Sequence, residues 1–497
     1  MNNIKPWSVF LCLGILMSIL FSSGQIENPD THLRLTQTRI FNEDGKFGLP
    51  NDVGEDHHGN IAITDSGQRH MVYNPGQTLL FLPIYFVADN IQENDADSYY
   101  TATFLVSFIN YLIHAICALF LFKITSSIGF SSRKSYFVAF VFLLTSYSFS
   151  FAQSTYEHHF EMLFILLGYY FIISKPNVYY ASLAGLAIAI GIIFRSTSIL
   201  AIPGILLLIE NTKTRLYFLS FLAPGVIAIL VYNFYRFGNP LETGYNLAWM
   251  LANGQNIEFW TVKRIPLSLI GFLFSPTKGL LFFSPTIILA LIGISRLWKR
   301  HRRLTLSILT LCGFYFLTFS MNFAWHGSIW SFGPRYILPV LPFLYIPLVE
   351  VEVKKWMFPV LIFSFLGQIL FTTVNYKKEV LEQYVKFDQI NEEQYIFSFN
   401  NNPYTVQFSQ LLQIIPKNIS GELKNYFPDT PWKKEIRTSS SKEILEFSIE
   451  KNSINYWWVR IFHWEKPLYQ KGITIFILFG AIVTIFILSK HVKRICE

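Results

Sequence analysis

The stretch GLLFFSPTIILALIGISRLWKRHRRLTLSILTLCGFYFLTFSMN at 279–322 decides the fold, because a dense block of positive charge separates two apolar runs. A helix needs roughly 17–25 apolar residues to cross the hydrocarbon layer of a membrane, and such runs lie on either side of RLWKRHRR (296–303). Loops on the cytoplasmic side of membranes are enriched in Lys and Arg. The stretch therefore predicts transmembrane helices over 279–296 and 304–322, joined by a cytoplasmic loop.

The composition of the whole chain agrees with a membrane protein. Of its 497 residues, 52% are hydrophobic and only 14% are charged, whereas a soluble domain has about 25% charged residues. The formal net charge of +8 comes from short Lys and Arg clusters between apolar runs, which the cytoplasmic bias explains without a nucleic-acid partner. We therefore expect no nucleic acid among the partners, and we interpret the four cysteines as small buried residues.

Comparable apolar runs elsewhere predict an all-α polytopic membrane protein with about 12 transmembrane helices. The further expected spans are 7–24, 101–123, 135–153, 158–174, 178–194, 197–210, 215–234, 335–350, 356–374 and 473–490. The first of them could be a cleaved signal peptide, but the weak cleavage site SSGQ favours a retained helix. With the N-terminus in the cytoplasm, every connection assigned to the cytoplasm carries a cation.

This topology divides the chain into three parts. They are a transmembrane domain over 1–374, an external soluble segment over 375–472, and a last helix with a cytoplasmic tail over 473–497. The transmembrane domain includes two external loops, 25–100 and 235–278. Each loop contains an apolar stretch too short or too broken to span, at 77–91 and 266–274, and we expect both stretches to lie in the membrane interface.

Ionisable residues gather at the external ends of the expected spans. The acidic ones are Glu27, Asp30, Glu157 and Glu161, the cations are Arg195, Arg236, Lys278 and Arg335, and His158 and His159 lie among them. A charge near the membrane costs free energy unless it is paired or functional. Carboxylates and cations at one face suit transfer from a phosphate-linked donor, because a carboxylate takes the acceptor's proton while Arg or Lys stabilises the leaving phosphate.

Four further features follow one another in a fixed order along the chain. They are a helix-like stretch from Asp30 to Gly45, YNPGQTLLFLPIYF (73–86), RFGNPLETGY (236–245) with SPTKGLLFFSP (275–285), and WSFGPRYILPVLP (330–342). In this order they resemble the membrane-embedded GT-C glycosyltransferases, the superfamily of the protein O-mannosyltransferases, the aminoarabinose transferases and the bacterial family 39-like enzymes. The resemblance covers roughly residues 7–375. It implies a glycosyltransferase that moves a sugar from a polyprenyl-phosphate donor to a glycan, lipid or protein acceptor on the non-cytoplasmic face.

The resemblance also implies roles for individual residues. Asp30 would be the general base, with Glu27 as the alternative, because Thr31 follows Asp30 where many family members have a second acidic residue. Glu157 or Glu161 would be the second external acid and would support the acceptor or a metal ion. The donor phosphate would be bound by Arg335, together with Lys278, Arg236 and Arg195.

Other interpretations stay open. EDHH (55–58), or His158 with His159, could bind a divalent metal ion as a cofactor, although adjacent histidines point to different faces of a helix or strand. Lys278 and Arg195 could be anchors at the membrane interface. The rival functions are a lipid or saccharide transporter, a polysaccharide polymerase or ligase, and an inactive scaffold. A transporter predicts charges near the middle of the membrane instead. The KRICE ending has no retrieval signal, which favours a bacterial inner membrane.

Overall fold

The protein is built almost entirely from helices. The computed structural model describes residues 5–26, 28–50, 60–92, 95–253, 258–327, 333–375, 396–420, 454–463 and 468–496. Within these residues, the two short strands β1 (Ile61–Ile63) and β2 (Arg69–Met71) form one antiparallel hairpin, with Ile61 opposite Met71. The all-α prediction is therefore confirmed, apart from this hairpin.

The helices fall into three groups along the chain. The first group is α1 (Pro6–Phe21), α2 (Pro29–Asp44), α3 (Gly76–Ile91), α4 (Asp95–Val106), α5 (Ile109–Ser127), α6 (Ser132–Thr145), α7 (Tyr147–Phe151) and η1 (Ala152–Ser154). The second is α8 (His158–Ser174), α9 (Val178–Phe194), η2 (Ser196–Ala201), α10 (Ile202–Leu208), α11 (Thr212–Phe237), α12 (Tyr245–Asn253), η3 (Val262–Arg264) and α13 (Ile265–Phe274). The third is α14 (Leu280–Phe283), α15 (Ile287–Arg300), α16 (Arg302–Met321), η4 (Arg335–Val340), α17 (Leu341–Tyr345), η5 (Ile346–Glu350), α18 (Met357–Thr373), η6 (Phe399–Asn401), α21 (Pro403–Ser420), α24 (Trp457–His463) and α25 (Leu468–Cys496).

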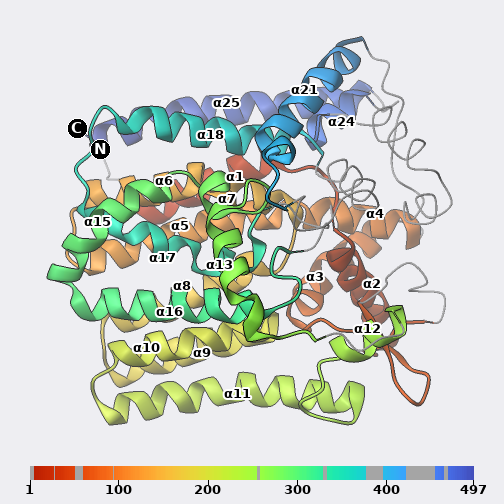
Figure 1. Cartoon of the computed structure of the whole chain (residues 1–497). Helices are drawn as coiled ribbons and strands as arrows, with labels where there is room; N and C mark the ends of the chain where they lie inside the picture. The colour runs from red at the N-terminus through yellow and green to blue at the C-terminus, as the bar shows by residue number, and fades with distance from the viewer. Residues whose placement is uncertain are drawn as a thin grey trace.

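The long helices lie side by side in one bundle, and its two ends differ in chemistry. Both chain termini and the connection from α15 to α16 lie at the left end in Figure 1, whereas α2, α3 and α12 gather at the right end. The left end contains the basic run at 296–303, where Arg300 pairs with Glu350 at 3.0 Å and Arg303 pairs with Glu210. The strongest positive cluster of the sequence therefore lies at the end of the bundle opposite α2.

Four helices of the described residues are long and apolar enough to cross a membrane, or five if the bent pair at 132–145 and 147–154 counts as one span. They are Asp97–Ser127, Thr212–Phe237, Arg302–Met321 and Leu468–Leu488. Shorter apolar helices lie at five further expected spans: Pro6–Phe21, His158–Ser174, Val178–Phe194, Ser196–Leu208 and Met357–Thr373. The structure is thus consistent with an integral membrane protein, while the predicted total number of crossings stays a prediction.

The two loops expected to be external contain the helices that the sequence indicated. The stretch from Asp30 to Gly45 forms α2, whose C-terminal cap is Gly45 in the left-handed conformation at φ 67°. The apolar stretches at 77–91 and 266–274 form α3 and α13. A helix that ends in a left-handed Gly is a common pattern, because Gly has no Cβ to clash there.

Described parts of the expected external segment 375–472 contact the bundle. Helix α21 packs on α18, and the Tyr404 hydroxyl donates a hydrogen bond of 2.8 Å to the carbonyl of Phe282. At the start of α24, the indole of Trp457 donates a 2.6 Å hydrogen bond to the carbonyl of Ile19 in α1. Residues 376–395, 421–453 and 464–467 of this segment lie outside the described residues.

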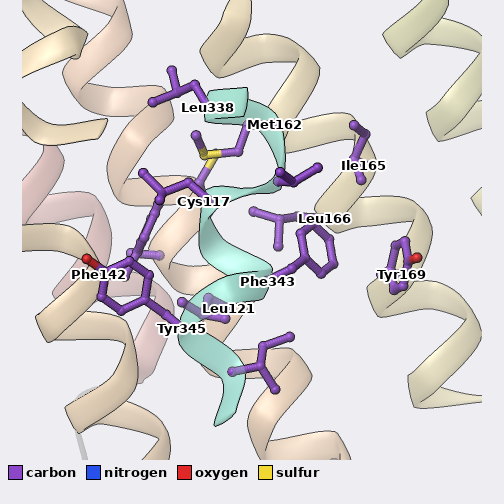
Figure 2. Close-up of a cluster of buried hydrophobic side chains, with 14 of the residues drawn as sticks. Cys117, Leu121, Phe142, Met162, Ile165, Leu166, Tyr169, Leu338, Phe343 and Tyr345 are labelled. Atoms are coloured by element: carbon purple, nitrogen blue, oxygen red, sulfur yellow. The ribbon is translucent and has the colours of Figure 1, made fainter. Parts of the chain in front are cut away.

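The segment 335–350 runs through the middle of the bundle and is not one regular helix. It consists of η4, α17 and η5, because Pro339, Pro342 and Pro347 lack the N–H that a continuous α-helix needs. Figure 2 shows this segment surrounded by buried side chains of α5, α6 and α8. A 3-10 helix rises about 2 Å per residue, so the 16 residues span about 30 Å, the thickness of the hydrocarbon layer.

Helices α9 and α11 approach each other closely because glycines lie at their interface. A Cβ atom on Gly225 of α11 would lie 2.4 Å from the carbonyl oxygen of Ala189, and one on Gly185 of α9 would lie 2.2 Å from that of Phe218. Small residues allow membrane helices to pack backbone to backbone. This contact fixes α9, whose C-terminal end carries Arg195.

We expect Gly225→Ala to lower the free energy of unfolding by about 1–3 kcal/mol, because the added methyl group meets backbone atoms that cannot move aside. Gly313→Ala is the matched control within α16, where an added Cβ has nothing within 4 Å. Because Ala has the better helix propensity, Gly313→Ala should leave the free energy of unfolding unchanged or raise it by up to about 1 kcal/mol. Unfolding of the purified proteins in detergent measures both effects, and equal stability of the two variants would contradict the close contact.

Candidate active site

Helix α2 is fixed to the bundle through its N-terminus. The Asn28 side chain caps the helix by accepting a 2.7 Å hydrogen bond from the Thr31 amide, and its own amide donates to the carbonyl of Ser154. Pro29 occupies the first helical position, where its missing N–H costs nothing. This arrangement places Asp30 in the first turn of α2, where it faces Arg335, and Arg34 one turn later, where it faces Glu157 before α8.

The loop before α8 contains a strained residue. Thr155 has φ 61°, in the left-handed region that β-branched residues rarely adopt. Its carbonyl accepts hydrogen bonds from the Gln77 amide at 3.0 Å and from the Thr31 hydroxyl at 3.2 Å. Strain of this kind persists only where the surroundings impose it. Contacts with α2 and α3 therefore fix the direction of the residues that follow, Tyr156 and Glu157.

Glu157 is the centre of a buried cluster of charges. One of its carboxylate oxygens lies 2.6 Å from a guanidinium nitrogen of Arg195, and the other lies 3.0 Å from Arg34. The side chains of Glu157 and Arg34 are only 6% and 3% exposed. Burial disfavours the charged carboxylate, but Arg34 and Arg195 outweigh this effect and lower the pKa of Glu157 below its ordinary value.

Arg195 also binds the second carboxylate of the α8 start. Its Nε lies 3.3 Å from Glu161, whose other oxygen accepts hydrogen bonds from the Thr197 hydroxyl at 2.5 Å and the Tyr315 hydroxyl at 2.7 Å. Arg195 is therefore a bridge between two carboxylates and not a solvated anchor at the membrane interface. The anchor interpretation of Arg195 did not include these contacts, because sequence alone does not reveal that both acids face it.

Arg335 lies on the side of the cluster that faces Asp30. Its guanidinium stacks on the rings of Tyr156 and Tyr336, at 5.0 and 4.9 Å from their centroids. Its nearest carboxylate among the described residues is that of Asp30, at 4.0 Å. Its Nη2 donates a 3.1 Å hydrogen bond to the Tyr336 hydroxyl, and a guanidinium that contacts aromatic rings keeps its remaining in-plane N–H groups available for an anion.

Asp30 is the most accessible carboxylate of the cluster. Its side chain is 15% exposed, against 6% for Glu157 and 0% for Glu161. Its described hydrogen-bond partner is the Asn60 amide at 3.4 Å. Tyr245 of α12, which is 41% exposed, interacts electrostatically with Asp30, Glu157 and Arg195 and so lies at the outer side of the cluster.

The other predicted site residues lie elsewhere or have other contacts. Arg236 is buried and donates hydrogen bonds to the carbonyls of Met71 at 2.5 Å and Tyr73 at 3.3 Å, so it fixes the β-hairpin to α11. Lys278 is buried in the turn before α14, near the Ser275 side chain. Glu27 and the EDHH stretch at 55–58 lie outside the described residues.

The two adjacent histidines have different surroundings. His159 contacts the Ser148 hydroxyl at 3.1 Å, and the same hydroxyl contacts His114 at 2.9 Å. His158 lies instead beside Tyr156 and Tyr336. Among the described residues, no group of three or more His, Cys, Asp or Glu side chains is placed to bind a metal ion.

Sequence reasoning missed several members of the cluster, among them Arg34, Thr197 and Tyr315. Arg34 carried a local signal, since it follows Asp30 by one turn of an expected helix and so lies on the same helical face. Tyr315 and Thr197 carried none, because they come from helices remote in sequence and look like ordinary residues of apolar segments. Comparison of the chain with known protein families finds no matching family model, and comparison with curated proteins finds no match.

We expect Glu157→Gln to lower the free energy of unfolding by roughly 3–5 kcal/mol, because it leaves the buried Arg34 without its carboxylate partner and Arg195 with Glu161 alone. Glu43→Gln is the matched control, since Glu43 pairs with Arg39 at 3.8 Å on the surface of α2. Loss of an exposed pair should cost about 0–1 kcal/mol. Chemical unfolding in detergent compares the two variants, and similar losses in both would show that the buried cluster does not stabilise the fold.

The contribution of Glu157 to stability should depend on pH in a defined direction. A carboxylate whose pKa is lowered in the folded protein stabilises it fully above the pKa of the unfolded chain, about 4.3, and loses this contribution as the pH falls further. The difference in unfolding free energy between the wild type and Glu157→Gln should therefore be constant between about pH 8 and pH 5 and shrink below about pH 4.3. A difference that instead grows on acidification would mean that Glu157 is protonated in the neutral folded protein.

Proposed function

We propose that the protein is a membrane glycosyltransferase that moves a sugar from a polyprenyl-phosphate donor to an acceptor on the non-cytoplasmic face. One observation carries this proposal: a partly exposed carboxylate, Asp30, faces an aromatic-stacked guanidinium, Arg335, at 4.0 Å. A base and a phosphate-binding cation are the two groups that such a transfer needs. The resemblance to GT-C glycosyltransferases gives the donor and acceptor classes.

Asp30 is the proposed general base. It accepts the proton of an acceptor hydroxyl or amine as the acceptor atom forms a bond to the anomeric carbon of the sugar. The bond between that carbon and the phosphate oxygen breaks at the same time, and the oxygen keeps the bonding electrons. Polyprenyl phosphate leaves with the added negative charge, which Arg335 stabilises by charge-assisted hydrogen bonds.

Glu157 and Glu161 have a positioning role in this proposal. Both carboxylates are buried, and their oxygens contact guanidinium or hydroxyl groups, which makes them poor acceptors for a substrate proton. Their contacts fix Arg34 and Arg195 beneath the proposed site. The base is therefore assigned to Asp30 among the described acids.

The position of the site suits a lipid-linked donor. The charged cluster lies near the end of a bundle of apolar helices, where the head group of a polyprenyl phosphate meets the protein while its tail stays in the lipid. The basic run at 296–303 lies at the opposite end (Figure 1). Under the positive-inside rule that run is cytoplasmic, so the site faces outward, to the periplasm if the membrane is a bacterial inner membrane.

We expect Asp30→Asn to reduce sugar transfer by about 100-fold to 10,000-fold, because the amide cannot accept the acceptor's proton. Asp44→Asn, at the exposed C-terminal end of the same helix, is the matched control and should transfer sugar at the wild-type rate. The measurement is transfer from a panel of polyprenyl-phosphate sugars by protein purified in detergent, with binding of polyprenyl phosphate recorded in parallel.

The possible results separate the alternatives. Loss of transfer with retained lipid binding in Asp30→Asn supports the proposed base. Undiminished transfer by this variant excludes Asp30 and moves the search to Glu27. A wild-type protein that binds the lipid but transfers no sugar from any donor favours a transporter or a scaffold over the enzyme.

A further inference from the structure

His158 is a buried side chain whose polar atoms have no partner among the described residues. It is only 1% exposed, and neither of its ring nitrogens makes a hydrogen bond within the part of the chain that the structure describes. The next residue, His159, is equally buried but contacts Ser148. A buried imidazole without a hydrogen bond costs free energy. A ligand that forms a hydrogen bond with it would remove this cost, so the group indicates a binding site.

The surroundings of His158 are those of Arg335. The His158 ring packs edge-on against Tyr156, with centroids 5.7 Å apart, and lies 6.2 Å from Tyr336. These two tyrosines are the rings on which the Arg335 guanidinium stacks. Arg195, Arg335 and Arg34 all interact electrostatically with the imidazole. His158 therefore belongs to the arginine side of the cluster, where an anion is favoured.

Other nitrogen donors beside His158 also have no partner. Nε of Arg335 and Nη1 of Arg34 are buried and make no hydrogen bond within the described residues. The carboxylate oxygens of the cluster that also lack a hydrogen bond, one each on Glu157 and Glu161, already face Arg34 at 3.0 Å and Arg195 at 3.3 Å, so these nitrogens have no described acceptor. Phosphate supplies several acceptor oxygens on one atom and so can satisfy them together.

We propose that His158 binds the phosphate of the lipid donor. A ring N–H of His158 donates a hydrogen bond to a non-bridging phosphate oxygen, while Arg335 and Arg34 bind the other oxygens. The same contacts remain when the sugar has left, so His158 also binds the product polyprenyl phosphate. This inference rests on the proposed function for the identity of the lipid. It adds His158 to Asp30 and Arg335 as a third residue of the proposed site, with the role of binding the donor phosphate.

His158→Phe tests the inference, because Phe keeps the ring packing against Tyr156 and removes both nitrogens. We expect the affinity for polyprenyl phosphate to fall roughly tenfold to a hundredfold, as for loss of a hydrogen bond to a charged group. Affinity for the phosphate-free polyprenol should not change. His158→Gln, whose amide N–H can replace that of the imidazole, should retain most of the phosphate affinity.

Stability in the absence of lipid separates binding from a structural role. Because His158→Phe removes unpaired buried nitrogens, the variant should unfold in detergent at the wild-type temperature or above it. His159→Phe is the matched control, since it loses the contact with Ser148 and should unfold at a lower temperature with unchanged affinity for polyprenyl phosphate. Inorganic phosphate should compete with polyprenyl phosphate in the wild type and less well in His158→Phe.

Each contrary result has a distinct meaning. If the wild type transfers sugar and His158→Phe binds polyprenyl phosphate equally tightly, the role of His158 is wrong and the proposed function stands. If His158→Phe unfolds at a clearly lower temperature and loses polyprenol and polyprenyl phosphate alike, His158 is structural. If the wild type does not prefer polyprenyl phosphate to polyprenol, both proposals are overturned. If it binds inorganic phosphate alone, a lipid donor is excluded.

Discussion

The rest of the structure depends on the two ion pairs that Glu157 makes with Arg34 and Arg195. These residues come from the start of α8, from α2 and from the end of α9, so one carboxylate connects three elements. Removing a partner from a buried ion pair leaves an uncompensated charge in an apolar environment, which is far more costly than losing an exposed pair. Any arrangement that separates α2 from α8 and α9 meets this cost. Asp30 lies on α2, which is not one of the long apolar helices. The ion pairs therefore hold α2, and Asp30 with it, against the end of the bundle.

The same constraint distributes the charges of the site unevenly. Arg195 is shared between Glu157 and Glu161 at 2.6 and 3.3 Å, whereas Arg335 lies 4.0 Å from its nearest described carboxylate, Asp30. A guanidinium whose N–H groups already face carboxylates has little capacity for a substrate phosphate. Arg335 contacts two aromatic rings instead and donates one hydrogen bond to Tyr336, so its other N–H groups keep that capacity. Of the cations that the sequence placed at this face, Arg335 thus suits an incoming anion best, and Arg195 stabilises the position of the acids.

Local patterns in the sequence predicted the parts of the fold that local patterns control. The apolar runs indicated the helices, and the stretch from Asp30 to Gly45 indicated α2 with its glycine cap. Long-range pairing was not accessible: nothing in the sequence shows that Arg236 donates to the carbonyls of Met71 and Tyr73, or that Tyr315 contacts Glu161. The irregular path of 335–350 did carry a signal, because three prolines in that segment exclude a continuous α-helix.

The strained Thr155 explains why one short loop can supply so much of the site. Its left-handed backbone turns the chain between η1 and α8, and hydrogen bonds from Gln77 and Thr31 to its carbonyl stabilise that turn. The three residues that follow then point into one region. Tyr156 stacks on Arg335, Glu157 pairs with Arg34 and Arg195, and His158 packs beside Tyr156. A regular helix would send consecutive side chains about 100° apart around its axis. The turn at Thr155 therefore sets the direction in which Tyr156 and Glu157 leave η1, and α8 begins directly after them at His158.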